Sequence, residues 1–180
     1  MDFSWSDIQN AQFEDVWDNG NGIIPIAAAG NENSTTTRYP ARFNSVMCVG
    51  ATIPFSVGGQ PADEQRIIAG DYLGYYWGSC YGETLDVMGF GERYITTDGV
   101  AADSYYDGAN DHFFNGTSCA TPMSAGVMAL IKSYFPEKNA KWCWDRLCET
   151  ADDLYVVGKD TDSGYGRANA LRAVYGSDKN

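Results

Sequence analysis

The pattern of apolar and polar positions changes along the chain, from short continuous apolar runs in some segments to helical spacing in others. Short apolar runs predict three strands, at Ile23–Ala29, Ser45–Ala51 and Thr84–Met88. Helical spacing predicts four helices, at Asp7–Asn19, from Ser118 through MSAGVMALIKSYF, at Asn139–Ala151 and, as a short one, within Gly164–Gly176. Strands that alternate with helices indicate a parallel sheet with helical crossovers, so we expect an α/β fold.

Two further stretches are harder to assign. Gly58–Tyr76 is polar and contains glycines, so we expect a surface loop or an extra hairpin there, and Tyr105–Asn115 is hairpin-like.

The 180 residues suffice for one hydrophobic core, and an apolar content of 44% is ordinary for a globular chain. We therefore interpret residues 1–180 as a single unit.

Charge narrows the classes of partner. Twelve basic and 24 acidic residues give a net charge of −12 without a basic cluster, which argues against nucleic-acid binding. No stretch approaches the roughly 20 apolar residues of a membrane span, so no membrane partner is predicted. Asp2 follows Met1 without a basic region, and no signal peptide is predicted on this chain.

The chain has five cysteines, an odd number whose spacing fits neither a metal site nor a disulfide framework. We expect reduced, partly buried thiols.

The first candidate for chemistry is the turn Asn115–Pro122, NGTSCATP, which places Ser118 where a helix begins. Unpaired N–H groups and the positive end of the helix dipole at that point favour negative charge beside the serine oxygen. Pro122 is tolerated in the first turn. The alternative is that Ser118 or Thr117 simply caps the helix.

A second motif strengthens the first. Gly22–Glu32, GIIPIAAAGNE, is an apolar run that breaks at Gly30 and presents Asn31. Acyl transfer through a serine needs an uncharged donor aimed where the carbonyl oxygen becomes an oxyanion, and a carboxamide is such a donor. By itself the run would be a buried strand that ends in a turn.

These two motifs resemble those of the subtilisin-like serine proteases, the subtilases, which have GTSxAxP at the nucleophile and AAGN at the oxyanion asparagine. Further segments, among them YPARFNSVMCVGAT and GYGRANALRAV, match in the family's order. The resemblance implies a serine endopeptidase with peptide or protein substrates, in which Ser118 is the nucleophile and Asn31 stabilises the oxyanion. It also implies a subtilisin-like parallel sheet with flanking helices. The chain would be the C-terminal part of one catalytic domain, so the sheet would be incomplete and would lack its N-terminal strands. No cofactor is required for the chemistry.

The family's other catalytic residues have no counterpart in this sequence. Its aspartate and histidine lie N-terminal to the segments matched here, and no HGT-type motif occurs. The single histidine, His112, stands where the family has no catalytic residue, so we expect a loop histidine. A missing N-terminal segment that carries the aspartate and histidine is therefore the implied partner, and the chain alone should be nearly inert. The alternative is a non-catalytic pseudoprotease fragment that binds peptide or protein. The resemblance suggests secretion or another extracytoplasmic location.

The resemblance also implies binding residues. Ser4, Trp5 and Ser6 align with the strand that pairs with substrate. The pocket for the residue before the cut bond would be walled by Ala28, Ala29, Gly30 and Glu32. Arg38 aligns near the base of that pocket, which hints at acidic or polar substrate side chains, although a surface ion pair with Glu32 is the alternative.

A weak structural cation site is implied as well. Tyr39 and Pro40 match a position where the family has a cis peptide bond. The carbonyls of Ala41, Phe43 and Val46 match a site for calcium or sodium, an assignment that carbonyl ligation leaves without a side-chain signature.

Overall fold

The computed structural model describes residues 5–53, 65–68, 70–72, 75–92 and 114–176. Its centre is a parallel sheet of three strands in the order β1 (Ile26–Ala28), β2 (Met47–Thr52) and β5 (Val87–Phe90). Every residue of β2 is buried, which is what a parallel strand covered on both faces requires. The predicted α/β class with a parallel sheet is confirmed.

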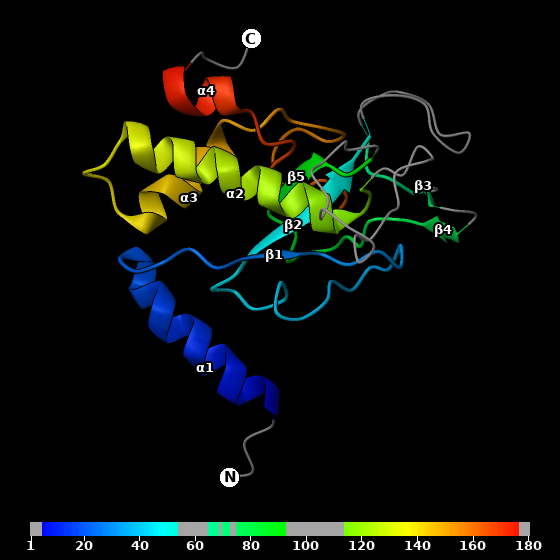
Figure 1. The fold of residues 1–180 in the computed structure, drawn as a ribbon, viewed down its shortest axis with the longest axis horizontal. Coiled ribbons are helices and arrows are strands. Elements are labelled where there is room, and N and C mark those ends of the chain that lie inside the picture. Colours follow the sequence, from blue (N-terminus) through cyan, green and yellow to red (C-terminus); the bar gives the residue numbers. More distant parts are fainter. Residues whose placement is uncertain (1–4, 54–64, 69, 73–74, 93–113, 177–180) are drawn as a thin grey trace, which may run out of the picture.

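Helices flank this sheet (Figure 1). The long helix α2 (Thr117–Tyr134) lies across the strands, α3 (Ala140–Glu149) and α4 (Ala170–Tyr175) lie beside it, and α1 (Trp5–Trp17) reaches away from the body near β1. The main core forms where β2 and β5 meet α2 and α3, around Val49, Val87, Ile131 and Leu147. Figure 1 thus shows a helical layer that positions the start of α2 over the sheet.

Most strand boundaries differ from the predicted ones for local reasons. Strand β1 begins at Ile26, three residues later than predicted, because Pro25 has no N–H to donate, although its carbonyl accepts from Met47 N at 2.8 Å. Strand β5 begins only at Val87, because the Leu85 N–H closes a turn onto the Gly82 carbonyl at 3.0 Å. The sheet is therefore shorter at its amino edge than the apolar runs suggest.

Helix α1 begins and ends two residues earlier than predicted. It gives way at Trp17 to a 3-10 turn, η1 (Asp18–Gly20), in which Asn19 has a φ of 51°. Asparagine tolerates this left-handed conformation better than most residues, so it can end a helix.

The stretch predicted as a loop or hairpin, Gly58–Tyr76, contains a hairpin of β3 (Gly70–Tyr72) and β4 (Tyr75–Trp77). Residues 58–64, 69 and 73–74 of that stretch, and 105–113 of the other predicted hairpin, lie outside the described residues.

The thiols and the cis bond agree with expectation. All five cysteines are free and buried. The Tyr39–Pro40 peptide bond is cis.

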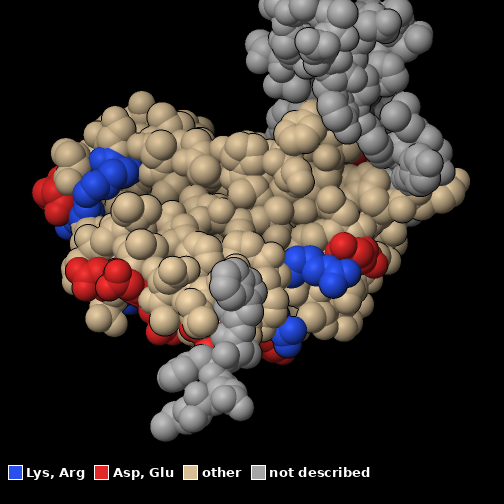
Figure 2. Space-filling model, turned by 60° about the horizontal axis from the view of Figure 1, so that its bottom comes forward, with Lys and Arg blue, Asp and Glu red and all other residues tan. Residues whose placement is uncertain are grey.

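Charges on the face drawn in Figure 2 lie in small groups, several of which combine both signs, and no continuous basic patch crosses it. None of the helices in the described ranges is long and apolar enough to cross a membrane.

Candidate active site

The serine lies where helix α2 begins, at the carboxyl edge of the sheet. Gly116 precedes the helix with a φ of 109° and a ψ of 172°, a combination that only glycine adopts readily, and its N–H donates to the Gly91 carbonyl just beyond β5 at 2.8 Å. Gly89 in β5 allows close approach, because a side chain there would stand 2.6 Å from the Ala120 carbonyl oxygen. The sheet therefore holds the first turn of α2 at close range.

Ser118 is exposed although the residues beside it, Thr117 and Cys119, are buried. No acidic side chain occupies the first turn, and no side chain caps it. No hydrogen-bond acceptor for the Ser118 N–H occurs in the described part of the chain. The positive end of the helix and a free donor thus lie beside the serine hydroxyl.

The asparagine lies one step beyond β1 at the same edge of the sheet. Gly30, with a φ of 111°, turns the chain after the strand, and Asn31 follows with an exposed side chain. Its Oδ1 accepts from both the backbone N–H and the hydroxyl of Thr117, each at 2.9 Å. Because a backbone N–H needs an acceptor, it is the oxygen of the carboxamide that faces Thr117. The Nδ2 group therefore points away from the Thr117 N–H.

Nδ2 lies beside the turn that carries the serine. A side chain on Gly116 would stand 3.2 Å from Asn31 Nδ2, so the amide packs against the residue two positions before Ser118. Over the residues described, no acceptor is bonded to this nitrogen. The structure therefore brings Asn31 against the turn that carries Ser118, 87 residues away in sequence, and leaves the Asn31 Nδ2 and the Ser118 N–H without acceptors among the described residues.

Sequence reasoning treated Thr117 only as a helix cap, yet it joins the two motifs. It is fully buried, and its hydroxyl oxygen also accepts from the Gly30 N–H at 3.3 Å. The hydroxyl thus contacts both Gly30 and Asn31 while its backbone opens α2. The signal was present in the GTS motif, but only tertiary contacts show what the threonine binds.

Cys119, next to the serine, is a packing residue. It is 4% exposed, and burial raises the pKa of its thiol to about 12. Because a thiol becomes a strong nucleophile as the thiolate, this environment does not activate Cys119.

The predicted pocket residues form one group beside Asn31. Ala28 ends β1, Ala29 is fully buried, and Gly30 packs against side chains that include Arg38. Glu32 and Arg38 form the surface ion pair proposed as the alternative, with Arg38 Nε 3.1 Å from Glu32 Oε2. The hydrogen bond from Arg38 lowers the pKa of Glu32, so this carboxyl is ionised at neutral pH.

The predicted substrate-pairing strand is wrong for two of its three residues. Trp5 and Ser6 lie in the first turn of α1, whose backbone groups are directed along the helix and cannot pair with an extended peptide. Helical periodicity across the segment prevailed over the motif-like serines. Ser4 and His112 lie outside the described residues.

The implied cation site gains no direct support. Ala41, Phe43 and Val46 are buried beside the cis bond, but the Phe43 carbonyl already accepts from Val46 N at 3.0 Å. Within the described ranges, no three His, Cys, Asp or Glu side chains group so that they could hold a metal ion. Calcium or sodium on the three carbonyls stays a prediction.

Comparison with known proteins gives consistent matches. The model of the subtilase family matches residues 3–167. The chain is 33% identical over 156 residues to a thermostable alkaline protease of Halalkalibacterium halodurans, covering 87% of this chain and 36% of that protein. Subtilisin BL of Lederbergia lenta is 33% identical over 153 residues, covering 85% and 46%. The chain therefore spans between a third and a half of the length of these relatives.

Solved structures agree on the fold. The psychrophilic subtilisin-like protease Apa1 from Pseudoalteromonas sp. AS-11 superposes with a TM-score of 0.67 at 18% identity, covering 92% of this chain and 66% of that one. A lanthipeptide protease gives a TM-score of 0.63 at 19% identity, covering 92% and 53%.

Proposed function

The chain belongs to the subtilase family, and on that premise we propose that it carries the nucleophile and oxyanion site of a serine endopeptidase. One observation supports this above the others. Asn31 is held by its oxygen on Thr117, so that its amide nitrogen and the Ser118 N–H are both unengaged beside an exposed hydroxyl. A simple helix cap would engage the first-turn donors instead.

The proposed chemistry uses these groups in two steps. Ser118 Oγ attacks the peptide carbonyl carbon while its proton passes to a base, and the carbonyl oxygen becomes an oxyanion between Asn31 Nδ2 and the Ser118 N–H. Collapse releases the amine, which takes the proton, and leaves an ester on Ser118 that water hydrolyses. No cofactor takes part. The base and its orienting carboxylate are proposed to come from a segment that carries the family's histidine and aspartate.

Asp86 offers no substitute for that aspartate. Asp86 is almost fully buried at the start of β5, where its Oδ2 accepts from Cys48 N at 2.9 Å and its Oδ1 pairs with Lys159 at 3.4 Å. Burial raises the pKa of Asp86, with the hydrogen bond and the lysine acting in the opposite direction. These contacts give Asp86 a structural role.

The pocket residues suggest which side chains a substrate presents before the cut bond. Glu32 Oε2 accepts from Asn31 N at 3.0 Å, from Arg38 Nε at 3.1 Å and from the Cys80 thiol at 3.2 Å. This oxygen is well satisfied, whereas only Nε of the Arg38 guanidinium is occupied by Glu32. The two Nη groups of Arg38 therefore remain as donors beside the ion pair, and we propose a preference for polar or acidic side chains over basic ones.

Complementation tests the proposal. The chain is assayed against an internally quenched peptide, alone and after mixing with a polypeptide that carries the family's aspartate and histidine segments. Cleavage only in the mixture, and not with Ser118→Ala, is the expected result. If the two polypeptides bind each other but no cleavage follows, or if Ser118→Ala cleaves equally well, Ser118 is not a working nucleophile and the alternative of a non-catalytic fragment is favoured.

A further inference from the structure

The segment that carries Asn31 rests against a second segment on the side away from Thr117. The Asn31 carbonyl accepts from Gly78 N at 3.2 Å, and the Asn33 N–H donates to the Gly78 carbonyl at 2.8 Å. The Gly30 carbonyl accepts from Cys80 N at 2.9 Å. The backbone position of Asn31 therefore depends on how firmly residues 78–80 are themselves held.

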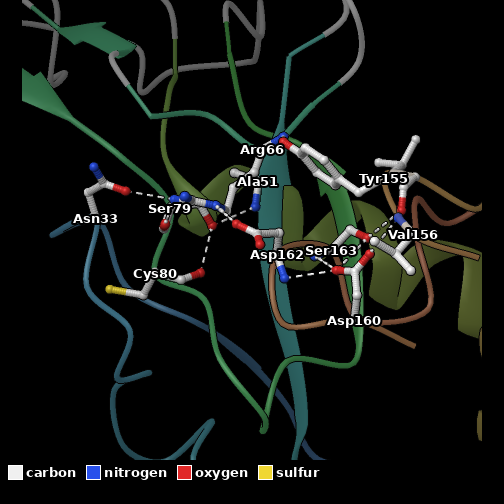
Figure 3. A network of polar contacts seen from close by, with 11 residues as sticks. Asn33, Ala51, Arg66, Ser79, Cys80, Tyr155, Val156, Asp160, Asp162 and Ser163 are labelled. Carbon is white, nitrogen blue, oxygen red and sulfur yellow. Dashed lines mark hydrogen bonds and ion pairs between the residues drawn. The ribbon is translucent and has the colours of Figure 1, made fainter. Parts of the chain in front are cut away.

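One guanidinium group bonds to both segments (Figure 3). Arg66 Nη1 donates to Asn33 Oδ1 at 2.6 Å and to the Ser79 carbonyl at 2.9 Å. Asn33 lies two residues beyond Asn31, and Ser79 lies between the two residues that bond to its segment. Arg66 thus joins the segments where their backbones already pair.

The guanidinium is itself held in place. Arg66 is only 7% exposed, and its guanidinium lies 3.9 Å from the centre of the Tyr81 ring. Its backbone is anchored because the next residue, Ile67, donates to the Ala51 carbonyl at 2.9 Å at the side of β2. A planar donor group with a fixed base and a stacked face has little freedom, so its bonds restrict their partners.

The ion pair between Arg66 and Asp162 contributes less to holding the two segments. Arg66 Nε lies 3.3 Å from Asp162 Oδ1, but the Asp162 side chain is 43% exposed, and exposed pairs of this kind contribute little. The bond to the Ser79 carbonyl is buried and the bond to Asn33 is partly buried, so losing these two bonds costs more than losing the ion pair.

We propose that Arg66 is a positioning residue that holds the oxyanion donor Asn31 through Asn33 and Ser79. The inference rests on the proposed function for its catalytic meaning, although the restraint on the segment can be measured without catalysis. Lysine cannot replace arginine here, because its ammonium nitrogen ends one bond short of the Nη1 position that donates to both acceptors, and because it has no planar face to lie on the Tyr81 ring.

Amide hydrogen exchange tests the restraint in Arg66→Lys. Arg172→Lys is the matched control, since Arg172 is a partly buried arginine that pairs with Asp152 at 2.8 Å, but in the C-terminal part of the chain. We expect exchange over residues 30–33 and 78–80 to become roughly tenfold faster in Arg66→Lys and to stay unchanged in the control. Unchanged exchange in Arg66→Lys would overturn the proposal.

A second variant guards against a general loss of stability. Asn33 is exposed and has a φ of 50°, and aspartate tolerates this conformation as asparagine does. Asn33→Asp places a charged acceptor against Arg66, so exchange over residues 30–33 should be equal to or slower than in the parent chain. Faster exchange in this variant would contradict the role of the Arg66–Asn33 bond.

Kinetics of the complemented protein separate positioning from mere stability. Arg66→Lys should lower kcat about tenfold with little change in KM, less than the loss of Asn31 itself. In an Asn31→Ala background the same change should cost nothing further. Equal losses in both backgrounds would overturn the inference. If the parent chain shows no activity even after complementation, the result counts against the proposed function, while the exchange result still decides the role of Arg66.

Discussion

Helix α2 begins differently from helices α3 and α4. Asn139 accepts from Trp142 N at 2.9 Å to cap α3, and Asn169 accepts from Arg172 N at 3.0 Å to cap α4. Helix α2 begins instead after Gly116, with no side-chain cap, although it is the longest helix in the described ranges and carries the serine.

The difference indicates what each helix start is for. A capped start satisfies its orphan donors and stabilises the fold, typically by about 1 kcal/mol. At the start of α2, Asn31 from a distant segment takes the Thr117 N–H, and the Ser118 N–H stays available. An N–H that is to stabilise a developing negative charge cannot also donate to a capping side chain. Helix α2, where the chemistry is proposed, therefore lacks the stability that a cap would add.

Removing Asn31 should have the largest effect. In the complemented protein, Asn31→Ala should lower kcat by about 10²–10³ and change KM little, which is the magnitude measured for the oxyanion asparagine of subtilisin, itself a member of this family. Steady-state kinetics on a quenched peptide measure it. The capped start provides the control, because Asn139→Ala should leave kcat unchanged. An equal fall in kcat for both variants would remove the distinction between the two helix starts.

Gly116→Ala should be the next most damaging change. The φ of 109° and ψ of 172° are nearly restricted to glycine, so alanine should destabilise the fold by about 1–3 kcal/mol. The new methyl group would also stand 3.2 Å from Asn31 Nδ2 and displace the donor. Urea unfolding measures the loss of stability, and fluorophosphonate labelling of Ser118 in the complemented protein measures the displacement of the donor. Full stability together with full reactivity would show that the turn can form without glycine.

The start of α4 should respond to pH through Asp152. Its carboxylate accepts from Asn169 Nδ2 and pairs with Arg167 at 2.9 Å and Arg172 at 2.8 Å. Burial would raise the pKa of Asp152, but these hydrogen bonds outweigh it and hold the pKa below the ordinary 3.8. The folded-state pKa is the lower one, so the carboxylate stabilises the fold above pH 3.8 and this contribution is lost as the pH falls through the folded-state pKa.

The corresponding variant tests the sign. Asp152→Asn should reduce the free energy of unfolding at neutral pH by about 1–3 kcal/mol, because charged hydrogen bonds to two arginines are lost. The gap between variant and parent should close as the pH is lowered below 3.8. Denaturant melts at several pH values measure it. A gap that widens on acidification would refute the assigned shift.

Asn139→Ala should have the smallest effect. Loss of the α3 cap should reduce the free energy of unfolding by about 1 kcal/mol and leave the reactivity of Ser118 unchanged. A thermal or urea melt checks the first part and fluorophosphonate labelling of the complemented protein the second. Altered labelling would mean that the two helix starts are coupled through the core.

The sequence predicts the elements and the two motifs well, because both depend on local patterns. Apolar runs located β2 and the helices, and AAGN with GTS located Asn31 and Ser118. The role of Thr117 could not be predicted, since its bonds to Gly30 and Asn31 cross 87 and 86 residues of chain. Arg66 was missed for the same reason, as its acceptors come from segments before and after it.

The error at Trp5 and Ser6 has a different origin. A short serine-bearing motif matched the family's substrate strand, whereas the helical periodicity that begins at the same residues determines the backbone. A three-residue match carries little information against a pattern that extends over 13 residues.

One claim underlies these proposals, and it can be tested by labelling the purified chain with a fluorophosphonate, followed by intact mass with Ser118→Ala as the control. The claim is that Ser118 and Asn31 form a prepared site whose base must be supplied by another segment. The chain alone should stay unlabelled, and addition of the segment with histidine and aspartate should produce one label per chain that Ser118→Ala abolishes. Stoichiometric labelling of Ser118 in the chain alone would contradict the claim.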